Sequence, residues 1–253
     1  MSNRVYTVTA DEAGYFYCRA LESRLNYKKN QQVCGCGCPC FVKSGDGQFV
    51  CRYKGEDGVP PLFPMVEGLN EKLQRAYAYA ANAHHGQRRK GTEMPYFSHI
   101  ITTMNYAVAL TDDVEVLSAA VLHDTVEDTT VTIEDIRREF GARVSFLVEA
   151  QTEDKRHNEP AAKTWEIRKR ETVAYLKDMP RDVKLITLAD KTANLEACVR
   201  EHRQVGDKLW EKFNQPDKKR QEWYFRACSE ALMELSDTSV MEKYFEYIDE
   251  LFG

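Results

Sequence analysis

The sequence predicts an all-α protein, a helical bundle that carries a small cysteine-rich N-terminal appendage. Three observations predict this fold class. Apolar residues recur with helical spacing nearly throughout the chain from Asn70 onward. Residues 1–66 differ in composition, because they are rich in turn-forming residues and hold a close cluster of cysteines. The chain is 43% hydrophobic and 30% charged, which is typical of a globular protein.

The length and charge of the chain limit its domain organisation and its partners. A chain of 253 residues has room for one large domain with a small appendage, and we expect a module over residues 1–66 and a helical domain over residues 67–253. The net charge of −5 argues against a broad nucleic-acid interface, which usually needs a basic face. The sequence shows no apolar signal segment and no long apolar run, so we expect a cytoplasmic protein without a membrane span.

Six of the eight cysteines lie in the N-terminal segment. Four of them alternate along residues 34–40, with Cys18 before and Cys51 after them. In a cytoplasmic protein such a cluster is more often a metal site than a disulfide framework. The remaining two, Cys198 and Cys228, lie in helical sequence and are expected to be inert core residues.

The same segment predicts a short β-hairpin around the turn Ser44-Gly-Asp-Gly. A hairpin of this size buries too little surface to be stable by itself, and a zinc ion held by four thiolates would stabilise it. Free thiols on an N-terminal arm are the alternative. The predicted zinc ligands are Cys18, Cys34, Cys38 and Cys51, with Cys36 and Cys40 as substitutes.

Helices follow one another from residue 70 to the C-terminus. Ser98 is the expected N-cap of the second helix, and Thr132 with Asp135 predicts a capping box for a short helix that Gly141 ends. A basic, turn-rich loop is expected over residues 86–96, and a polar loop over 153–163. The predicted helical segments are 73–84, 98–110, 116–128, 132–140, 144–148, 164–177, 181–200, 218–235 and 241–252.

The third of these segments carries the most informative residues. Residues 116–122 are apolar almost all round, so the helix should be buried, yet His123, Asp124, Glu127 and Asp128 follow directly. Residues four apart share one face of a helix. Burying an imidazole and three carboxylates is costly unless a cation or specific hydrogen bonds compensate. A bound metal is the simplest solution, and a helix cap or a buried ion pair is the alternative.

Further ligands would have to come from other helices. His99 begins a helix after the basic loop, and Asp190 interrupts the apolar helix 181–200, with Asn194 one turn further on. Taken alone, His99 reads as a core histidine and Asp190 reads equally well as a hydrogen-bonded carboxylate. Imidazole and carboxylate ligands suit manganese, iron or zinc, and open coordination positions mark a catalytic site.

Four stretches now carry a resemblance to a known family: Gly86-Gln-Arg-Arg-Lys, Met94-Pro-Tyr-Phe-Ser-His, Ala120-Val-Leu-His-Asp-Thr-Val-Glu-Asp-Thr and Leu188-Ala-Asp-Lys-Thr-Ala-Asn-Leu. In this order and spacing, the chain resembles the HD-domain phosphohydrolases over residues 70 to about 235. Within them it is similar to the RelA/SpoT-type alarmone hydrolases and their stand-alone relatives, the small alarmone hydrolases.

The resemblance implies an all-α HD-domain helical bundle that binds manganese through His99, His123, Asp124 and Asp190. It implies hydrolysis of the 3′-pyrophosphate of guanosine tetra- or pentaphosphate, without a synthetase domain. Glu127 and Asp128 are then placed to orient the attacking water and take its proton. The residues expected to bind the substrate are Arg89, Lys90, Asn194, Lys155 and Arg220, with Lys219 as a substitute for Arg220.

Three other interpretations remain open. The same site would suit another nucleotide, such as NADPH or an adenosine alarmone, because the pocket rather than the fold decides the substrate. The chain would otherwise be an interaction protein that uses its cysteine-rich module. As a hydrolase, it would also be suited to functional pairing with an alarmone synthetase.

Overall fold

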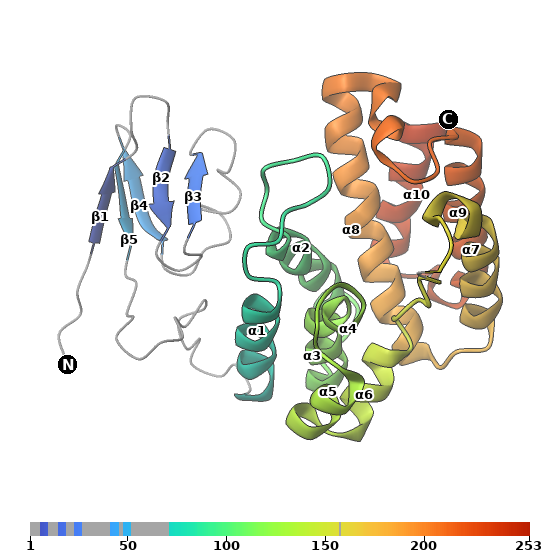
Figure 1. The fold of residues 1–253 in the computed structure, drawn as a ribbon, viewed down its shortest axis with the longest axis horizontal. Helices are drawn as coiled ribbons and strands as arrows, with labels where there is room; N and C mark the ends of the chain where they lie inside the picture. Colours follow the sequence, from blue (N-terminus) through green and yellow to red (C-terminus); the bar gives the residue numbers. More distant parts are fainter. Residues whose placement is uncertain are drawn as a thin grey trace. The chain divides into compact units, whose positions relative to one another are not determined.

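The computed structural model divides into two compact units, Met1–Ala78 and Tyr79–Gly253 (Figure 1). The predicted boundary between residues 66 and 67 lies outside the described residues, so it stays a prediction. The structure describes residues 6–9, 15–18, 23–26, 41–45, 48–51, 71–156 and 158–253.

Among the described residues of the N-terminal unit, five short strands form two antiparallel sheets. One sheet has the order β1-β5-β4 and the other pairs β2 with β3. The predicted hairpin is confirmed, because β4 and β5 pair antiparallel with Gly45 opposite Gln48. The strands are β1 (Tyr6–Thr9), β2 (Tyr15–Cys18), β3 (Ser23–Asn26), β4 (Phe41–Gly45) and β5 (Gln48–Cys51).

Two of the predicted zinc ligands end strands, Cys18 in β2 and Cys51 in β5. Cys34 and Cys38, and the substitutes Cys36 and Cys40, lie outside the described residues. The zinc site therefore stays a prediction.

The helical prediction is confirmed for the described residues from 71 onward, where the one β feature is an isolated bridge between Arg88 and Pro95. The helices are α1 (Glu71–Ala83), α2 (Phe97–Ala107), α3 (Val114–Leu122), α4 (Thr125–Asp128), α5 (Ile133–Phe140), α6 (Ala142–Glu149), α7 (Ala161–Lys177), α8 (Arg181–Val205), α9 (Lys218–Ala231) and α10 (Ser239–Phe252), with 3-10 turns η1 (Gly206–Lys212) and η2 (Met233–Leu235).

Helix α8 is the central element of the second unit, and α2, α3 and α10 pack against it (Figure 1). Its apolar residues Ile186, Leu188 and Leu195 are fully buried, as the sequence predicts for a helix apolar on most sides. The helix continues to Val205, beyond the predicted end at residue 200. It stops at Gly206, whose φ of 62° is a conformation that glycine adopts at little cost.

The prediction of one helix over residues 116–128 is wrong in one respect, because the helix is interrupted at His123 and Asp124. Helix α3 ends at Leu122, His123 and Asp124 form a turn, and α4 starts at Thr125. Asp124 has φ −94° and ψ −3°, which departs from the ideal helix and lets the chain change direction.

Other helix ends also differ from the prediction. Ser98 is not the N-cap of α2, because the helix begins one residue earlier and the Ser98 hydroxyl donates to the Pro95 carbonyl instead (2.8 Å). Helix α7 begins at Ala161, directly after Pro160, whose fixed φ favours the start of a helix. The predicted segment 218–235 divides into α9 and η2.

The predicted capping box of α5 is confirmed. The Thr132 hydroxyl accepts from the Asp135 backbone N–H (3.2 Å), and the Asp135 carboxylate accepts from the Thr132 N–H (3.1 Å). Gly141 then ends α5 with φ 93°. The reciprocal hydrogen bonds satisfy two backbone donors that the first turn of a helix would leave unpaired.

Two sequence expectations about the interior can be assessed directly. Cys198 and Cys228 are both buried, as predicted, and burial raises the pKa of each thiol to about 11. Among the described residues, no helix is both long enough and apolar enough to cross a membrane.

The N-cap of α3 generates a test of this fold. The Asp113 carboxylate accepts from the backbone N–H of Glu115 (2.9 Å) and of Val116 (3.3 Å), and also meets Arg143 on α6 (2.8 Å). We expect Asp113→Ala to lower the free energy of unfolding by about 1 kcal/mol, because the cap is lost. Urea unfolding followed by circular dichroism measures this.

The control is Asp113→Asn, which keeps a capping oxygen and removes only the charge. An exposed ion pair contributes about 0–1 kcal/mol, so we expect this variant to stay closer to the wild type than Asp113→Ala does. Equal losses in the two variants would show that the ion pair with Arg143, rather than the cap, stabilises this end of α3.

Candidate metal centre

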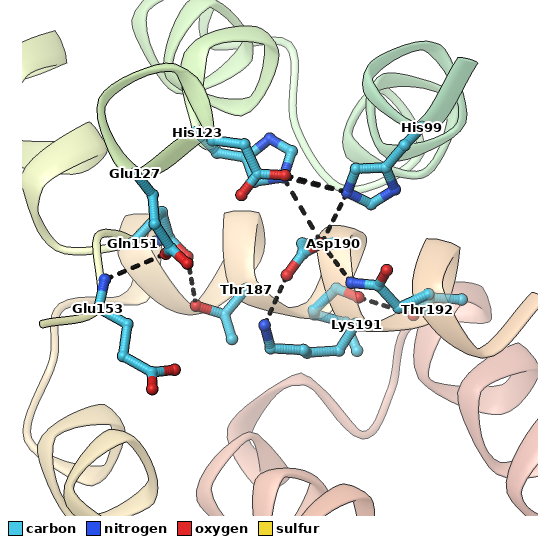
Figure 2. A network of polar contacts seen from close by, with 12 residues as sticks. His99, His123, Glu127, Gln151, Glu153, Thr187, Asp190, Lys191 and Thr192 are labelled. Atoms are coloured by element: carbon cyan, nitrogen blue, oxygen red, sulfur yellow. Dashed lines mark hydrogen bonds and ion pairs between the residues drawn. The ribbon is translucent and has the colours of Figure 1, made fainter. Parts of the chain in front are cut away.

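Three segments far apart in the sequence bring four potential metal ligands together. His99 lies in the first turn of α2, His123 and Asp124 form the turn between α3 and α4, and Asp190 lies in the middle of α8. His99, His123 and Asp190 are at most 6% exposed. Figure 2 shows the two imidazoles converging on Asp190.

The ligand atoms lie close enough to share one cation. The Nε2 atoms of His99 and His123 are 3.3 Å apart. Oδ1 of Asp190 is 3.1 Å from Nε2 of His99 and 3.5 Å from Nε2 of His123. Oδ2 of Asp124 is 3.0 Å from Nε2 of His123 and 3.4 Å from Nε2 of His99. His99, His123 and Asp124 alone make a group that could hold a metal ion.

The hydrogen bonds of His123 fix which of its nitrogens faces the cluster as an acceptor. Its Nδ1 is 2.8 Å from the Ala120 carbonyl, which can only accept, so Nδ1 carries a proton. In the neutral ring, Nε2 then presents a lone pair to the centre of the cluster. Backbone carbonyls commonly orient metal-binding histidines in this way, by accepting from the ring nitrogen that does not face the metal.

Burial and opposite charges shift the pKa values of three residues in the cluster, His123, Asp124 and Asp190. Burial opposes the charged form of His123, but Asp124 and Asp190 outweigh burial and raise its pKa well above the usual value. Burial likewise opposes ionisation of Asp124 and Asp190, but His123 with His99, and for Asp190 also Lys191, lower both carboxyl pKa values. Two carboxylates facing two imidazole nitrogens therefore favour positive charge at their centre. This donor set fits a divalent cation, which would take the place of protons.

Two other residues of α8, Lys191 and Asn194, contact the Asp190 carboxylate. Lys191 Nζ is 2.6 Å from the second carboxylate oxygen, Oδ2 (Figure 2). The Asn194 amide donates to Oδ1 (2.7 Å). Arg89 in turn donates to the Asn194 amide oxygen (3.0 Å). Two predicted substrate residues, Arg89 and Asn194, thus connect the basic loop to the Asp190 carboxylate.

Glu127 and Asp128 lie on α4, and the loop after α6 contacts both of them. The Glu127 carboxylate accepts from the Glu153 backbone N–H (3.1 Å) (Figure 2). Lys155 Nζ lies 3.4 Å from the same carboxylate. Lys155 also forms an ion pair with Asp128. Burial, together with the nearby Asp124 carboxylate, raises the pKa of Glu127.

The two remaining predicted substrate residues make contacts elsewhere. Lys90 donates to the Asn214 side chain (3.1 Å), and Arg220 on α9 pairs with Glu166 on α7 (3.2 Å). Lys219, the substitute for Arg220, is exposed at the start of α9. None of these contacts joins them to the four clustered ligands.

Sequence reasoning missed Tyr96, Lys191 and Glu153 as contributors to the site. The Tyr96 hydroxyl contacts Asp124 (2.5 Å) and Asp128 (2.9 Å). Burial, with both carboxylates, raises its pKa. A signal for Tyr96 was available, since a residue three before His99 lies on the same side of a helical turn. Lys191 directly follows a ligand, but nothing in the local pattern of Glu153 indicates its role.

Comparison with known proteins agrees with this architecture. The chain matches the HD domain family over residues 76–216. It is 41% identical over 128 residues to guanosine-3′,5′-bis(diphosphate) 3′-pyrophosphohydrolase MESH1 of Mus musculus, which covers 49% of this chain and 68% of that protein. It is 40% identical over 144 residues to a GTP pyrophosphokinase of Streptomyces coelicolor, of whose length it spans only 16%.

Two solved structures resemble the chain in fold. One is described as a metazoan ortholog of SpoT that hydrolyzes ppGpp; it has a TM-score of 0.57 and 32% identity, and the match covers 72% of this chain and 96% of that one. The other, lmo0812 of Listeria monocytogenes EGD-e, has a TM-score of 0.54 and 26% identity, covering 61% of this chain and 98% of that one. With more than half of its length matched and with the paired histidines and aspartates brought together, the chain belongs to the HD domain family.

Proposed function

We propose that this protein is a metal-dependent hydrolase that removes the 3′-pyrophosphate from guanosine tetra- or pentaphosphate. The observation that carries the proposal is the buried convergence of two imidazole nitrogens and two carboxylates from three separate segments. The activities for which the similar proteins are named support the choice of substrate. Functional pairing with an alarmone synthetase belongs to the same proposal.

His99, His123, Asp124 and Asp190 would hold the metal, and we propose manganese. Nitrogen and oxygen donors of this kind suit manganese, iron or zinc, and four protein ligands leave positions open on a metal that takes more. When bound, such an ion lowers the pKa of water and polarises a phosphoryl oxygen.

The chain's own carboxylates handle the proton. Glu127 is half-buried and its pKa is raised, which suits a group that accepts a proton from an attacking water. Asp128 helps to orient that water, while Lys155 balances the charge of the pair. Hydrolysis breaks the bond between the ribose 3′ oxygen and phosphorus, while the water oxygen bonds to that phosphorus and the 3′ oxygen takes up a proton. The products are pyrophosphate and guanosine diphosphate from the tetraphosphate, or guanosine triphosphate from the pentaphosphate.

Arg89, Lys90, Asn194, Lys155 and Arg220 would contact the substrate. The Arg89 guanidinium is planar and can stack on a purine, and lysine ammonium groups can meet phosphate. Arg89 now donates to Asn194, and Lys155 pairs with Asp128. Substrate binding would therefore exchange these internal partners for the base and the phosphates.

A direct assay tests the proposed substrate. We expect the full chain with Mn²⁺ to release pyrophosphate from guanosine tetraphosphate, measured by ion-exchange chromatography. NADPH and the adenosine analogue are parallel substrates. Release of single phosphate from NADPH, with no turnover of guanosine tetraphosphate, would show an HD enzyme with a different substrate.

The matched control for this assay is His123→Ala. Loss of a residue that only supports a metal ligand lowers activity about 10–100-fold. We expect a greater loss in His123→Ala, because a proposed metal ligand itself is removed. Circular dichroism should show the fold retained. Full activity in this variant would refute the proposed metal site.

The raised pKa of Glu127 predicts the acid limb of the pH–rate profile. A general base acts when deprotonated, so kcat should fall as the pH drops through the pKa of Glu127, which lies above the usual value of about 4.3. Glu127→Gln should lower kcat by about 10²–10⁴-fold and remove that limb. Steady-state kinetics between pH 4 and pH 8 measure both.

Asp154→Asn is the control, because Asp154 is an exposed carboxylate in the adjacent loop and caps only the Arg156 N–H (3.0 Å). Its profile should match the wild type. If Glu127→Gln keeps the wild-type kcat and acid limb, Glu127 is not the proton acceptor.

We further propose a structural zinc ion bound by Cys18, Cys34, Cys38 and Cys51. The alternating cysteines and the small size of the adjacent hairpin support it. Elemental analysis of the full chain should find one zinc ion, which Cys51→Ser should reduce and Cys198→Ser should leave unchanged. A zinc-free wild-type chain would refute this site.

A further inference from the structure

The hydroxyl of Tyr96 contacts two carboxylates of the site, those of Asp124 and Asp128. It lies 2.5 Å from Oδ2 of Asp124 and 2.9 Å from Oδ2 of Asp128. The same Asp124 oxygen faces the two imidazoles, at 3.0 Å from His123 and 3.4 Å from His99. One phenol therefore touches both a proposed metal ligand and a proposed catalytic residue.

The aromatic ring of Tyr96 is held on several sides. It stacks on His84, with centroids 4.8 Å apart and planes at 16°, and meets His99 edge-on at 5.8 Å. The Arg89 guanidinium lies 5.6 Å from its centroid. These contacts fix the direction of the hydroxyl without using it, so a phenylalanine ring would fit the same space.

Gln87 joins the backbone at Tyr96 to the backbone at the end of α4. Its Oε1 accepts from His84 Nδ1 (2.8 Å), and its Nε2 donates to the Asp128 carbonyl (2.7 Å). The Tyr96 backbone N–H donates to the Gln87 carbonyl (2.9 Å). The start of α2 and the end of α4 are thus joined through one residue, and this keeps the Tyr96 hydroxyl within reach of both carboxylates.

A phenol has one proton to donate. The hydroxyl lies within donor distance of both carboxylates, and the shorter contact makes Asp124 the main acceptor. A hydrogen bond to a ligating carboxylate restricts its rotation, and such supporting residues affect metal affinity about 10–100-fold.

We propose that Tyr96 is a positioning residue that aligns the Asp124 carboxylate for metal binding and sets its spacing from Asp128. This inference rests on the proposed function, since it assigns Tyr96 a role in that metal site. Tyr96 itself need not touch the substrate.

Tyr96→Phe tests the inference, with Tyr106→Phe as the matched control. Tyr106 lies on α2 as well, and its hydroxyl also donates to a carboxylate, Glu196 (2.8 Å), without contacting the four ligands. Titration calorimetry of the full chain with Mn²⁺ should give a Kd about 10–100-fold weaker for Tyr96→Phe and an unchanged Kd for Tyr106→Phe.

Kinetics and thermal melting separate positioning from general damage. At saturating Mn²⁺, the kcat of Tyr96→Phe should still lie below that of the wild type, with little change in KM for guanosine tetraphosphate. The Tm of Tyr96→Phe should not fall below that of Tyr106→Phe. Wild-type Mn²⁺ affinity and kcat in Tyr96→Phe, beside an active wild-type enzyme, would overturn the role of Tyr96 alone. A wild-type chain that binds no Mn²⁺ would overturn both this inference and the proposed function.

Discussion

The structure of the second unit depends on one electrostatic constraint, the meeting of four donor groups in a buried place. Two imidazole nitrogens 3.3 Å apart and two carboxylates cannot be buried at low cost without positive charge between them. Three segments supply these groups, so α2, α3 and α8 must pack closely against one another. A centre of this kind ties function to packing, because a shift of any one of these helices separates the ligands.

Support for the centre comes from outside the four ligands. The Ala120 carbonyl orients His123, Lys191 and Asn194 hold Asp190, and Tyr96 holds Asp124. Three of the four residues, His123, Asp190 and Asp124, are therefore restrained by a neighbour that lies in a helix or at its start. Such restraint reduces the reorganisation that a cation would require on binding.

Sequence reasoning predicts the periodic elements well and their junctions poorly. The capping box of α5 and the burial of α8 follow from local chemistry, and both are observed. The break between α3 and α4 does not follow from local pattern, because residues 116–128 are compatible with one helix. Adjacent residues of a continuous helix point about 100° apart, and the turn that follows the end of α3 at Leu122 lets His123 and Asp124 face the same centre. Partners such as Glu153 and Lys155 depend on tertiary packing, which spacing along the chain does not contain.

The chain of hydrogen bonds from Arg89 through Asn194 to Asp190 has a thermodynamic consequence. A nucleotide that draws Arg89 away changes the surroundings of a carboxylate that faces the cation. Occupancy of one position then alters affinity at the other, and linkage requires the effect to be equal in both directions. The saturation of each site would thus depend on the concentration of the other ligand as well as on that of its own.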